Sequence, residues 1–385
     1  MGKYIMKLDI NYFQYLLLAL FPIMSLYEFL PLINIGYFIL LLLIIINIFS
    51  NKFNLKINLK ILITMTTFMV INMIVGITKY IDLTNTINNT IGMLVFTIIA
   101  IFICVPNFIN MDKLYRSCKL VAIVATIFLF YQFLAYHLLG RGIQGNIPFL
   151  TPNNTGFDSI NYGRPTSFFY EPAHYALYIG PIFAISLIRR ELLISLILIL
   201  GLILSTSSTG IVIAISFPIL VFFIGTKRFS MKNILIILAG SLILFFITSN
   251  YYDSLFEKFS INELKNNIRI FGTLDYFKYF STNDWLFGIG INRLTEYLSL
   301  HGYLYSENYA SSYIFSVFSF GIVGGIVWLM FSFSLYKSIL KKYKIIYVAF
   351  IYMCLTDQVL FNSNLLYILM WIYAISSIKE RKKII

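Results

Sequence analysis

Long apolar runs recur along almost the whole of this 385-residue chain, separated by short polar and basic clusters. A helix needs about 20 apolar residues to cross a bilayer, with a range of roughly 17–25. The pattern therefore predicts an all-α integral membrane protein with about twelve transmembrane helices, forming a single polytopic domain over residues 1–385. The predicted spans are 11–30, 32–49, 61–78, 90–106, 120–139, 173–188, 192–206, 209–225, 233–250, 309–335, 345–361 and 365–378.

Composition supports a membrane protein. Soluble proteins are about 45–50% apolar and about 25% charged, whereas 59% of this chain is hydrophobic and 12% is charged. The net charge of +13 does not indicate a nucleic-acid partner, because the basic residues lie in short clusters between the apolar runs. The cysteines (Cys104, Cys118 and Cys354) are odd in number and predict no disulfide framework. No metal or other cofactor is expected.

The basic clusters also predict the orientation. Starting from the N-terminus, every second connection between predicted spans is rich in Lys and Arg, and most of the 29 basic residues fall in these connections. The positive-inside rule places such connections in the cytoplasm. Both termini are therefore predicted to be cytoplasmic.

Two long connections, 140–172 and 251–308, fall on the predicted outer side. Long loops in compact folds tend to be functional or disordered, and the aromatic residues and prolines of the first loop favour a folded segment. The second loop has apolar residues at the 3–4 spacing of an amphipathic helix, which we expect to lie on the outer membrane surface. These residues are Ile261, Leu264, Ile268, Phe271, Leu274 and Phe277.

Five ionisable residues map near the outer ends of the predicted spans: Glu28, His137, Glu171, His174 and Asp357. A charge at the bilayer centre costs at least ~2.5 kcal/mol, so such groups are expected to face a cavity rather than lipid. The pattern predicts a polar chamber that opens outward. The alternative is that some of these side chains reach the interface or cap helices.

The segment from Arg164 to Tyr175 joins the first long loop to a span. Pro172 suits the first position of a helix, and Glu171 then lies at the helix N-terminus, where the macrodipole favours a carboxylate. Glu171 is predicted to be a catalytic acid or base with Arg164 as its partner, and a helix cap is the alternative. Glu171 and His174 have the spacing of a metal pair, but no second motif supports a metal site.

The second long loop contains Arg269 and Arg293, which oppose the positive-inside bias and therefore need a reason. A guanidinium suits bidentate contact with a diphosphate. An ion pair of these arginines with Asp275 or Glu296 is the structural alternative. The Gly288-x-Gly290 sequence alone does not indicate a nucleotide fold.

Glu307 and Asn308 precede a span that contains Gly321, Gly324 and Gly325, and these small residues are expected to let helices pack closely. Glu307 is a candidate general base, and a solvated loop carboxylate is the alternative. Residues expected to contact substrate, besides the arginines, are His174, His301, Asn308 and Asp357.

Together these segments resemble the bacterial O-antigen polymerase and ligase superfamily. Arg164 to Pro172 resembles its Arg…Phe…Glu-Pro segment, and Arg269 with Trp285 to Gly290 resembles its Arg and Trp-Leu-x-Gly-x-Gly pattern. Glu307-Asn308 stands where ligases often have His-Asn, and Ser208 to Gly210 departs from a common Ser-Arg pair.

The resemblance implies a metal-independent membrane glycosyltransferase of the bacterial cytoplasmic (inner) membrane. Such an enzyme polymerises undecaprenyl-diphosphate-linked oligosaccharide repeat units into O-antigen or capsular polysaccharide at the outer face. The growing chain moves onto the terminal sugar of a new lipid-linked unit. The implied partners are this lipid-linked oligosaccharide, membrane lipid and a regulator of chain length.

Two alternatives remain open from the sequence. The first is a ligase that transfers finished glycan to a different acceptor, against which Glu307 in the place of His argues. The second is a transporter or flippase for lipid-linked sugars, for which we would expect ionisable residues near the midplane and inverted repeats with broken helices.

Overall fold

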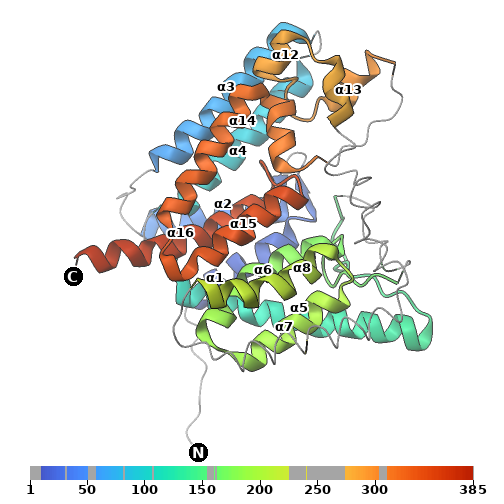
Figure 1. The fold of residues 1–385 in the computed structure, drawn as a ribbon, viewed down its shortest axis with the longest axis vertical. Helices are drawn as coiled ribbons and strands as arrows, with labels where there is room; N and C mark the ends of the chain where they lie inside the picture. The colour runs from blue at the N-terminus through green and yellow to red at the C-terminus, as the bar shows by residue number, and fades with distance from the viewer. Residues whose placement is uncertain are drawn as a thin grey trace, which may run out of the picture.

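The computed structural model describes residues 10–30, 33–50, 58–80, 83–105, 108–153, 160, 163–224, 240, 274–302 and 310–384. In these ranges the chain is mostly helical, as Figure 1 shows. The larger helices are α1 (Ile10–Met24), α2 (Ile35–Ser50), α3 (Leu59–Lys79), α4 (Thr84–Ile103), α5 (Met111–Leu139), α6 (Pro172–Arg189), α7 (Leu192–Leu204), α8 (Ser208–Phe223), α14 (Ser312–Ser338), α15 (Lys344–Thr356) and α16 (Ser363–Ile384).

Short elements connect these helices. The antiparallel strands β1 (Glu28–Leu30) and β2 (Ile33–Asn34) join α1 to α2. The second long loop contains the 3₁₀ helix η3 (Leu274–Tyr279) and the helices α12 (Thr282–Phe287) and α13 (Leu294–Ser299). A further 3₁₀ helix, η4 (Lys341–Tyr343), precedes α15.

Four helices, α3, α4, α5 and α14, are long and apolar enough to cross a membrane, and shorter apolar helices accompany them. The chain is therefore mostly helical and suited to a multi-pass membrane protein, while the count of twelve spans stays a prediction. The predicted span 233–250, apart from residue 240, lies outside the described residues. So does most of the predicted amphipathic segment from Ile261 to Phe277, whose last residues, Leu274 and Phe277, lie in the 3₁₀ helix η3.

Several predicted boundaries differ from the structure. Helix α5 begins at Met111 instead of 120, α15 ends at Thr356 instead of 361, and α16 continues to Ile384 instead of 378. The first span was expected to reach residue 30, but α1 ends at Met24 and the chain turns into the β1–β2 hairpin. The fourth span was expected to begin at residue 90, but α4 begins at Thr84. The polar side chains near its start find partners inside the protein: the Thr90 hydroxyl donates to the Thr86 carbonyl, and the Asn72 side chain of α3 donates to Thr90.

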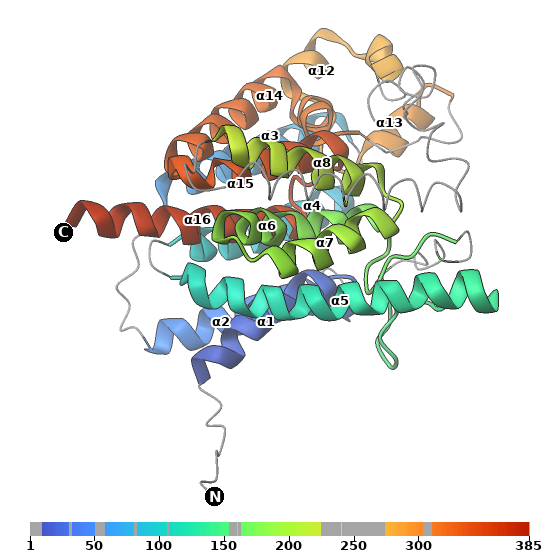
Figure 2. The ribbon, with the colours of Figure 1, turned by 60° about the horizontal axis from the view of Figure 1, so that its bottom comes forward.

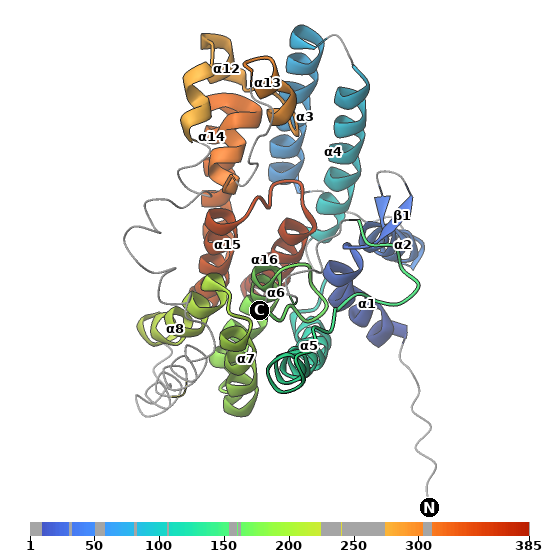
Figure 3. The same ribbon diagram turned by 90° about the vertical axis from the view of Figure 1, so that its right-hand side faces the viewer.

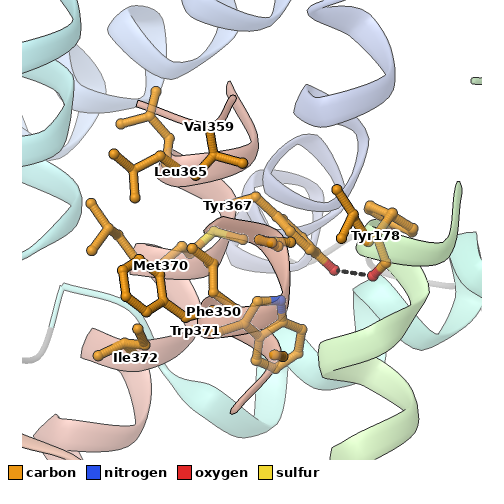
Figure 4. Packing of buried hydrophobic residues seen from close by; sticks show 14 of the residues in the cluster. Tyr178, Phe350, Val359, Leu365, Tyr367, Met370, Trp371 and Ile372 are labelled. Atoms are coloured by element: carbon orange, nitrogen blue, oxygen red, sulfur yellow. Dashed lines mark hydrogen bonds between the residues drawn. The ribbon is translucent and has the colours of Figure 1, made fainter. Parts of the chain in front are cut away.

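Helix α6 lies at the centre of the helical assembly, in contact with α5, α7, α8, α15 and α16. Most of its residues are buried. Figure 4 shows part of this core, where the ring of Tyr178 on α6 stacks on that of Tyr367 on α16 with centroids 5.0 Å apart. The Tyr367 hydroxyl donates to the Tyr178 carbonyl at 3.0 Å. The buried phenol is thus satisfied without water, as a membrane interior requires.

One end of the bundle carries ion pairs between helices. Arg189 at the end of α6 pairs with Asp112 at the start of α5, and Lys119 pairs with Glu191 at 2.8 Å. The loop that joins α5 to α6 lies at the opposite helix ends, and Figure 2 shows it on the side away from the C-terminus. The ion-paired end is the one that the basic clusters predict to be cytoplasmic.

Helix α14 is broken at Gly321, where the backbone is non-helical with φ 66° and ψ −169°. The second long loop packs into this break. The amides of Ile289 and Gly290 donate to the carbonyls of Phe318 and Ser319 at 2.9 Å and 3.0 Å. Loop amides thereby bond carbonyls beside the interruption of the helix, which is how broken helices are tolerated at membrane depth.

The same loop is held from its other side by α3 and α4. The Tyr80 hydroxyl donates to the Ile289 carbonyl at 2.7 Å, the Ile291 amide donates to Asn72 at 3.0 Å, and Asn89 donates to the Ile291 carbonyl at 2.9 Å. Figure 3 shows α12 and α13 beside the upper ends of α3 and α14. The segment from Gly288 to Ile291 is therefore a fixed wedge between α3, α4 and α14.

Candidate functional site

A polar cavity of about 380 Å³ opens where the loop-side ends of several helices meet. It takes residues from the end of α1, the start of α2, the start of α6 and the turn between α15 and α16, and it receives one asparagine from each long loop. The described lining residues are Pro22, Ser25, Leu26, Asn34, Tyr37, Asn153, Phe169, Tyr170, His174, Ile291, Asn292, Gln358, Leu360, Phe361, Asn362, Ser363 and Asn364.

The first long loop is tied to the end of α1, which fixes one wall of the cavity. The Asn153 amide donates to the Leu26 carbonyl at 2.9 Å, and its side chain donates to the Ser25 carbonyl at 3.1 Å. The Tyr170 hydroxyl donates to the Leu26 carbonyl. These bonds hold Asn153 and Tyr170 in place although no helix carries them.

The turn from Asp357 to Asn362 forms the opposite wall and is anchored on the start of α14. The Ser312 hydroxyl donates to the Asp357 carbonyl at 2.7 Å and lies 2.8 Å from the Val359 amide that donates to it. Phe361 has a positive φ of 62°. A positive φ is uncommon for a residue other than glycine, and such residues are often found at functional sites.

His174 and Asp357, both predicted from the sequence, come together at this cavity. His174 Nε2 lies 3.6 Å from Asp357 Oδ2, and each side chain is 24% exposed. Asp357 also accepts from the Gln358 amide at 2.8 Å and from the Asn364 side chain at 3.4 Å. A carboxylate held beside an imidazole can orient the ring and stabilise its protonated form.

Carboxamides dominate the polar part of the lining. A carboxamide donates through its nitrogen and accepts through its oxygen. It can therefore act as hydrogen-bond donor or acceptor toward a hydroxyl. The cavity also has aromatic rings, namely those of Tyr37, Phe169, Tyr170 and Phe361. Carboxamides beside aromatic faces match a sugar ring, which has hydroxyls at its edge and C–H groups on its faces.

Arg293 is next in sequence to the lining residue Asn292, but its side chain does not line the cavity. Its side chain is 2% exposed, pairs with Glu296, and lies over the ring of Tyr80 at 4.1 Å. It also donates to the Thr86 hydroxyl. This is the structural alternative that the sequence left open, and it ties α13 to α3 and α4.

The other predicted site residues are spread over the loop side. Arg164 is half-buried in the segment before α6, and Glu171 is half-buried as the N-cap of α6 without a side-chain cap bond. His301 follows α13, where its ring stacks on Tyr279 with centroids 4.9 Å apart. Arg269, Glu307 and Asn308 lie outside the described residues.

Of the remaining members of the predicted chamber, neither lines the described cavity. Glu28 is exposed on β1, and the ring of His137 contacts that of Phe133 with centroids 4.5 Å apart. The structure thus brings together two of the five ionisable residues, His174 and Asp357, with Glu171 one helical turn before His174.

An ion pair that sequence reasoning missed holds the second long loop on α3. Lys79 at the end of α3 pairs with Asp284 of α12 and donates to the Gly288 carbonyl at 2.7 Å. Asp284 also accepts from the Ser281 hydroxyl at 2.7 Å and from the Tyr297 hydroxyl at 3.1 Å. The sequence feature that could have predicted this ion pair is Lys79 itself, because it is a basic residue on the predicted outer side.

These contacts predict a pH-dependent contribution to stability. Burial opposes ionisation of Asp284, but hydrogen bonds from Lys79 and Ser281 outweigh it and lower the pKa of this carboxyl. Because the pKa is lower in the folded state, the stabilisation is complete above the ordinary value of about 3.9 and is lost as the pH falls through the lowered value.

We expect Asp284→Asn to lower the free energy of unfolding by about 2–3 kcal/mol at pH 7, because it leaves Lys79 without its carboxylate. The difference from wild type should shrink as the pH falls below about 4. Thermal unfolding in detergent across this pH range measures it. Asp275→Asn is the matched control, because Asp275 is exposed on η3. A constant difference at all pH values would contradict the assignment.

Comparisons with models of known families, with curated proteins and with solved structures found no match, so the fold and the cavity are the observations on which a function can be based.

Proposed function

We propose that this protein is a membrane glycosyltransferase that polymerises lipid-linked oligosaccharide repeat units, with the cavity holding the sugar that accepts the growing chain. The observation that carries the proposal is the lining of carboxamides and aromatic rings around the His174–Asp357 pair. The resemblance of the loop motifs to the O-antigen polymerase and ligase superfamily points to the same chemistry.

The position of the cavity suits an amphiphilic substrate. Its lining residues come from the helix ends opposite the end that carries the Arg189–Asp112 pair. With the orientation that the basic clusters predict, this is the outer face of the bacterial cytoplasmic membrane. A lipid-linked oligosaccharide would keep its isoprenoid chain in the bilayer while its sugars reach the cavity from the outer leaflet.

The proposed reaction forms one bond and breaks one. A hydroxyl oxygen of the acceptor sugar attacks the anomeric carbon of the growing chain, and the bond from that carbon to the diphosphate oxygen breaks. The lipid diphosphate leaves with the bonding electron pair. His174, oriented by Asp357, accepts the proton of the attacking hydroxyl. Glu171 and Glu307, the bases predicted from the sequence, are the alternative acceptors of this proton.

The three arginines predicted as site residues have different roles in this proposal. Arg164 and Arg269 are the residues that we propose for contact with the diphosphate, whose leaving charge guanidinium groups can stabilise. Arg293, buried against Glu296 and Tyr80, instead positions the second long loop and thereby Asn292. Asn308 and His301, from the same loop, are proposed to contact the glycan.

One observation favours the transporter as a second candidate. Helix α14 is broken at Gly321, and broken helices are a feature of many transporters. A transporter or flippase forms no glycosidic bond, whereas a polymerase makes a ladder of products from one lipid-linked unit. A ligase would instead need a different acceptor.

The deciding experiment supplies the purified full chain in lipid nanodiscs with an undecaprenyl-diphosphate-linked oligosaccharide and resolves the products by gel. We expect a ladder whose steps equal one repeat unit. Absence of any longer product with repeat units from several different glycans, in protein that remains folded, would reject the polymerase. Transfer to an added non-identical acceptor without a ladder would indicate the ligase.

A further inference from the structure

We propose that the cavity selects a neutral sugar, a hexose or an N-acetylhexosamine, and rejects a uronic acid or another anionic sugar at the accepting end of the glycan. This inference deepens the proposed function and rests on it for the presence of a glycan. It follows from the charges, the hydrogen-bonding groups and the size of the cavity.

The hydrogen-bonding groups of the lining are mostly uncharged amides. They come from four separate parts of the chain and converge on one volume: Asn34, Asn153, Asn292, and Gln358, Asn362 and Asn364 together. Some are partly used by the protein, since Asn34 accepts from the Tyr37 amide at 2.8 Å and Asn364 donates to Asp357. Hydroxyl and acetamido groups both donate and accept, so amides can satisfy either.

Two carboxylates lie next to residues of the described lining. Asp357 lies behind His174, and Glu171 lies between the lining residue Tyr170 and the first turn of α6. Within the ranges that the structure describes, the lining contains no lysine or arginine. A sugar carboxylate here would lose water without gaining a lysine or arginine of the described lining as a partner, and it would lie near the Asp357 carboxylate behind His174, which is unfavourable for a buried charge.

The size and the aromatic faces fit a neutral sugar. The volume of about 380 Å³ is at the lower end for ligand pockets, which suits the terminal part of a glycan. Phe169 and Tyr170 from the first long loop and Phe361 from the turn before α16 supply ring surfaces. Such faces pack on the C–H groups of a pyranose and gain from removing apolar surface from water.

The test compares two undecaprenyl-diphosphate disaccharides that differ only at C6 of the terminal sugar, one ending in glucose and the other in glucuronic acid. Binding to the full chain in nanodiscs is measured first, and turnover second. We expect the glucose probe to bind at least about tenfold more tightly, the effect of one unfavourable buried charge after partial solvent screening. Equal binding, or tighter binding of the glucuronic acid probe, would overturn the inference.

Two variants assign the selectivity to the cavity. Gln358→Arg places a guanidinium in the lining and should narrow or reverse the preference, because it can pair with the sugar carboxylate. Gln358→Met, of similar length and without charge, should weaken both probes alike. An unchanged preference in Gln358→Arg would show that selection occurs elsewhere and would reject the cavity as its origin.

The two proposals fail in different ways. If the glucose probe binds selectively but is not elongated, the polymerase is rejected while the neutral-sugar site stands. If both probes elongate at equal rates and bind equally, the polymerase stands and the selectivity is rejected. If neither probe binds to folded protein, both proposals are rejected.

Discussion

Replacing His174 with alanine is expected to lower the rate of sugar transfer by about 100-fold or more, because general acid–base catalysis typically contributes 10²–10⁴-fold. The imidazole lines the cavity and has the Asp357 carboxylate 3.6 Å from its Nε2. The measurement is the initial rate of ladder formation in nanodiscs with saturating lipid-linked unit. Binding of that unit should change far less than the rate, because the proton moves only in the reaction.

The partner and the control make this prediction specific. Asp357→Asn should lower the same rate by about tenfold or more, because an amide cannot stabilise the imidazolium. His137→Ala is the matched control, since its ring contacts Phe133 and does not line the cavity, and it should retain wild-type activity. Full activity in His174→Ala would remove this residue from the reaction and leave the role of base to Glu171 or Glu307.

The largest expected effect on stability is at the break in α14. A Cβ added at Gly321 would lie 2.2 Å from the Leu286 carbonyl oxygen, and one added at Gly288 would lie 2.4 Å from the Phe320 nitrogen. Both glycines also have positive φ, at 66° and 78°. We therefore expect Gly321→Ala and Gly288→Ala each to lower the free energy of unfolding by about 3 kcal/mol or more, by clash and backbone strain together.

Two further alanine substitutions separate the causes. An added Cβ at Gly92 meets nothing within 4 Å, so Gly92→Ala within α4 should be neutral or stabilising by about 0.5–1 kcal/mol. Gly140 has an equally open surrounding but a φ of 62°, so Gly140→Ala should cost only the strain, about 1–2 kcal/mol. Retention of monodisperse protein after heating in detergent ranks the four variants. Equal stability of Gly321→Ala and Gly92→Ala would contradict the wedge.

The glycine pattern shows where sequence reasoning was incomplete. The Gly288-x-Gly290 sequence alone indicates no nucleotide fold, and nothing along the chain indicates that Gly288 packs against Ser319 and Phe320 of α14. The contact depends on a close approach of two backbones that are remote in sequence. The glycines of α14 were expected to let helices pack closely, and at Gly321 the close neighbour is instead the loop at Leu286 and Phe287.

Arg293 shows a second limit of reading charges from sequence. An arginine on the predicted outer side needs a reason, and both a diphosphate and an ion pair supply one. The choice depends on whether Glu296 lies within reach and whether an aromatic ring covers the guanidinium. In the folded protein Glu296 pairs with the guanidinium and the ring of Tyr80 covers it. Tyr80 comes from the C-terminal end of α3.

The sequence alone determined that the chain is a helical membrane protein, because apolar runs and basic clusters act locally, through the cost of exposing side chains to lipid or water. It also placed His174 and Asp357 at helix ends on one predicted side. Only the tertiary structure decided that these two meet, that asparagines from both long loops converge beside them, and that Lys79 and Asp284 fix one loop. Such contacts join residues far apart in the chain, and they form because distant backbones pack together, which local patterns do not encode.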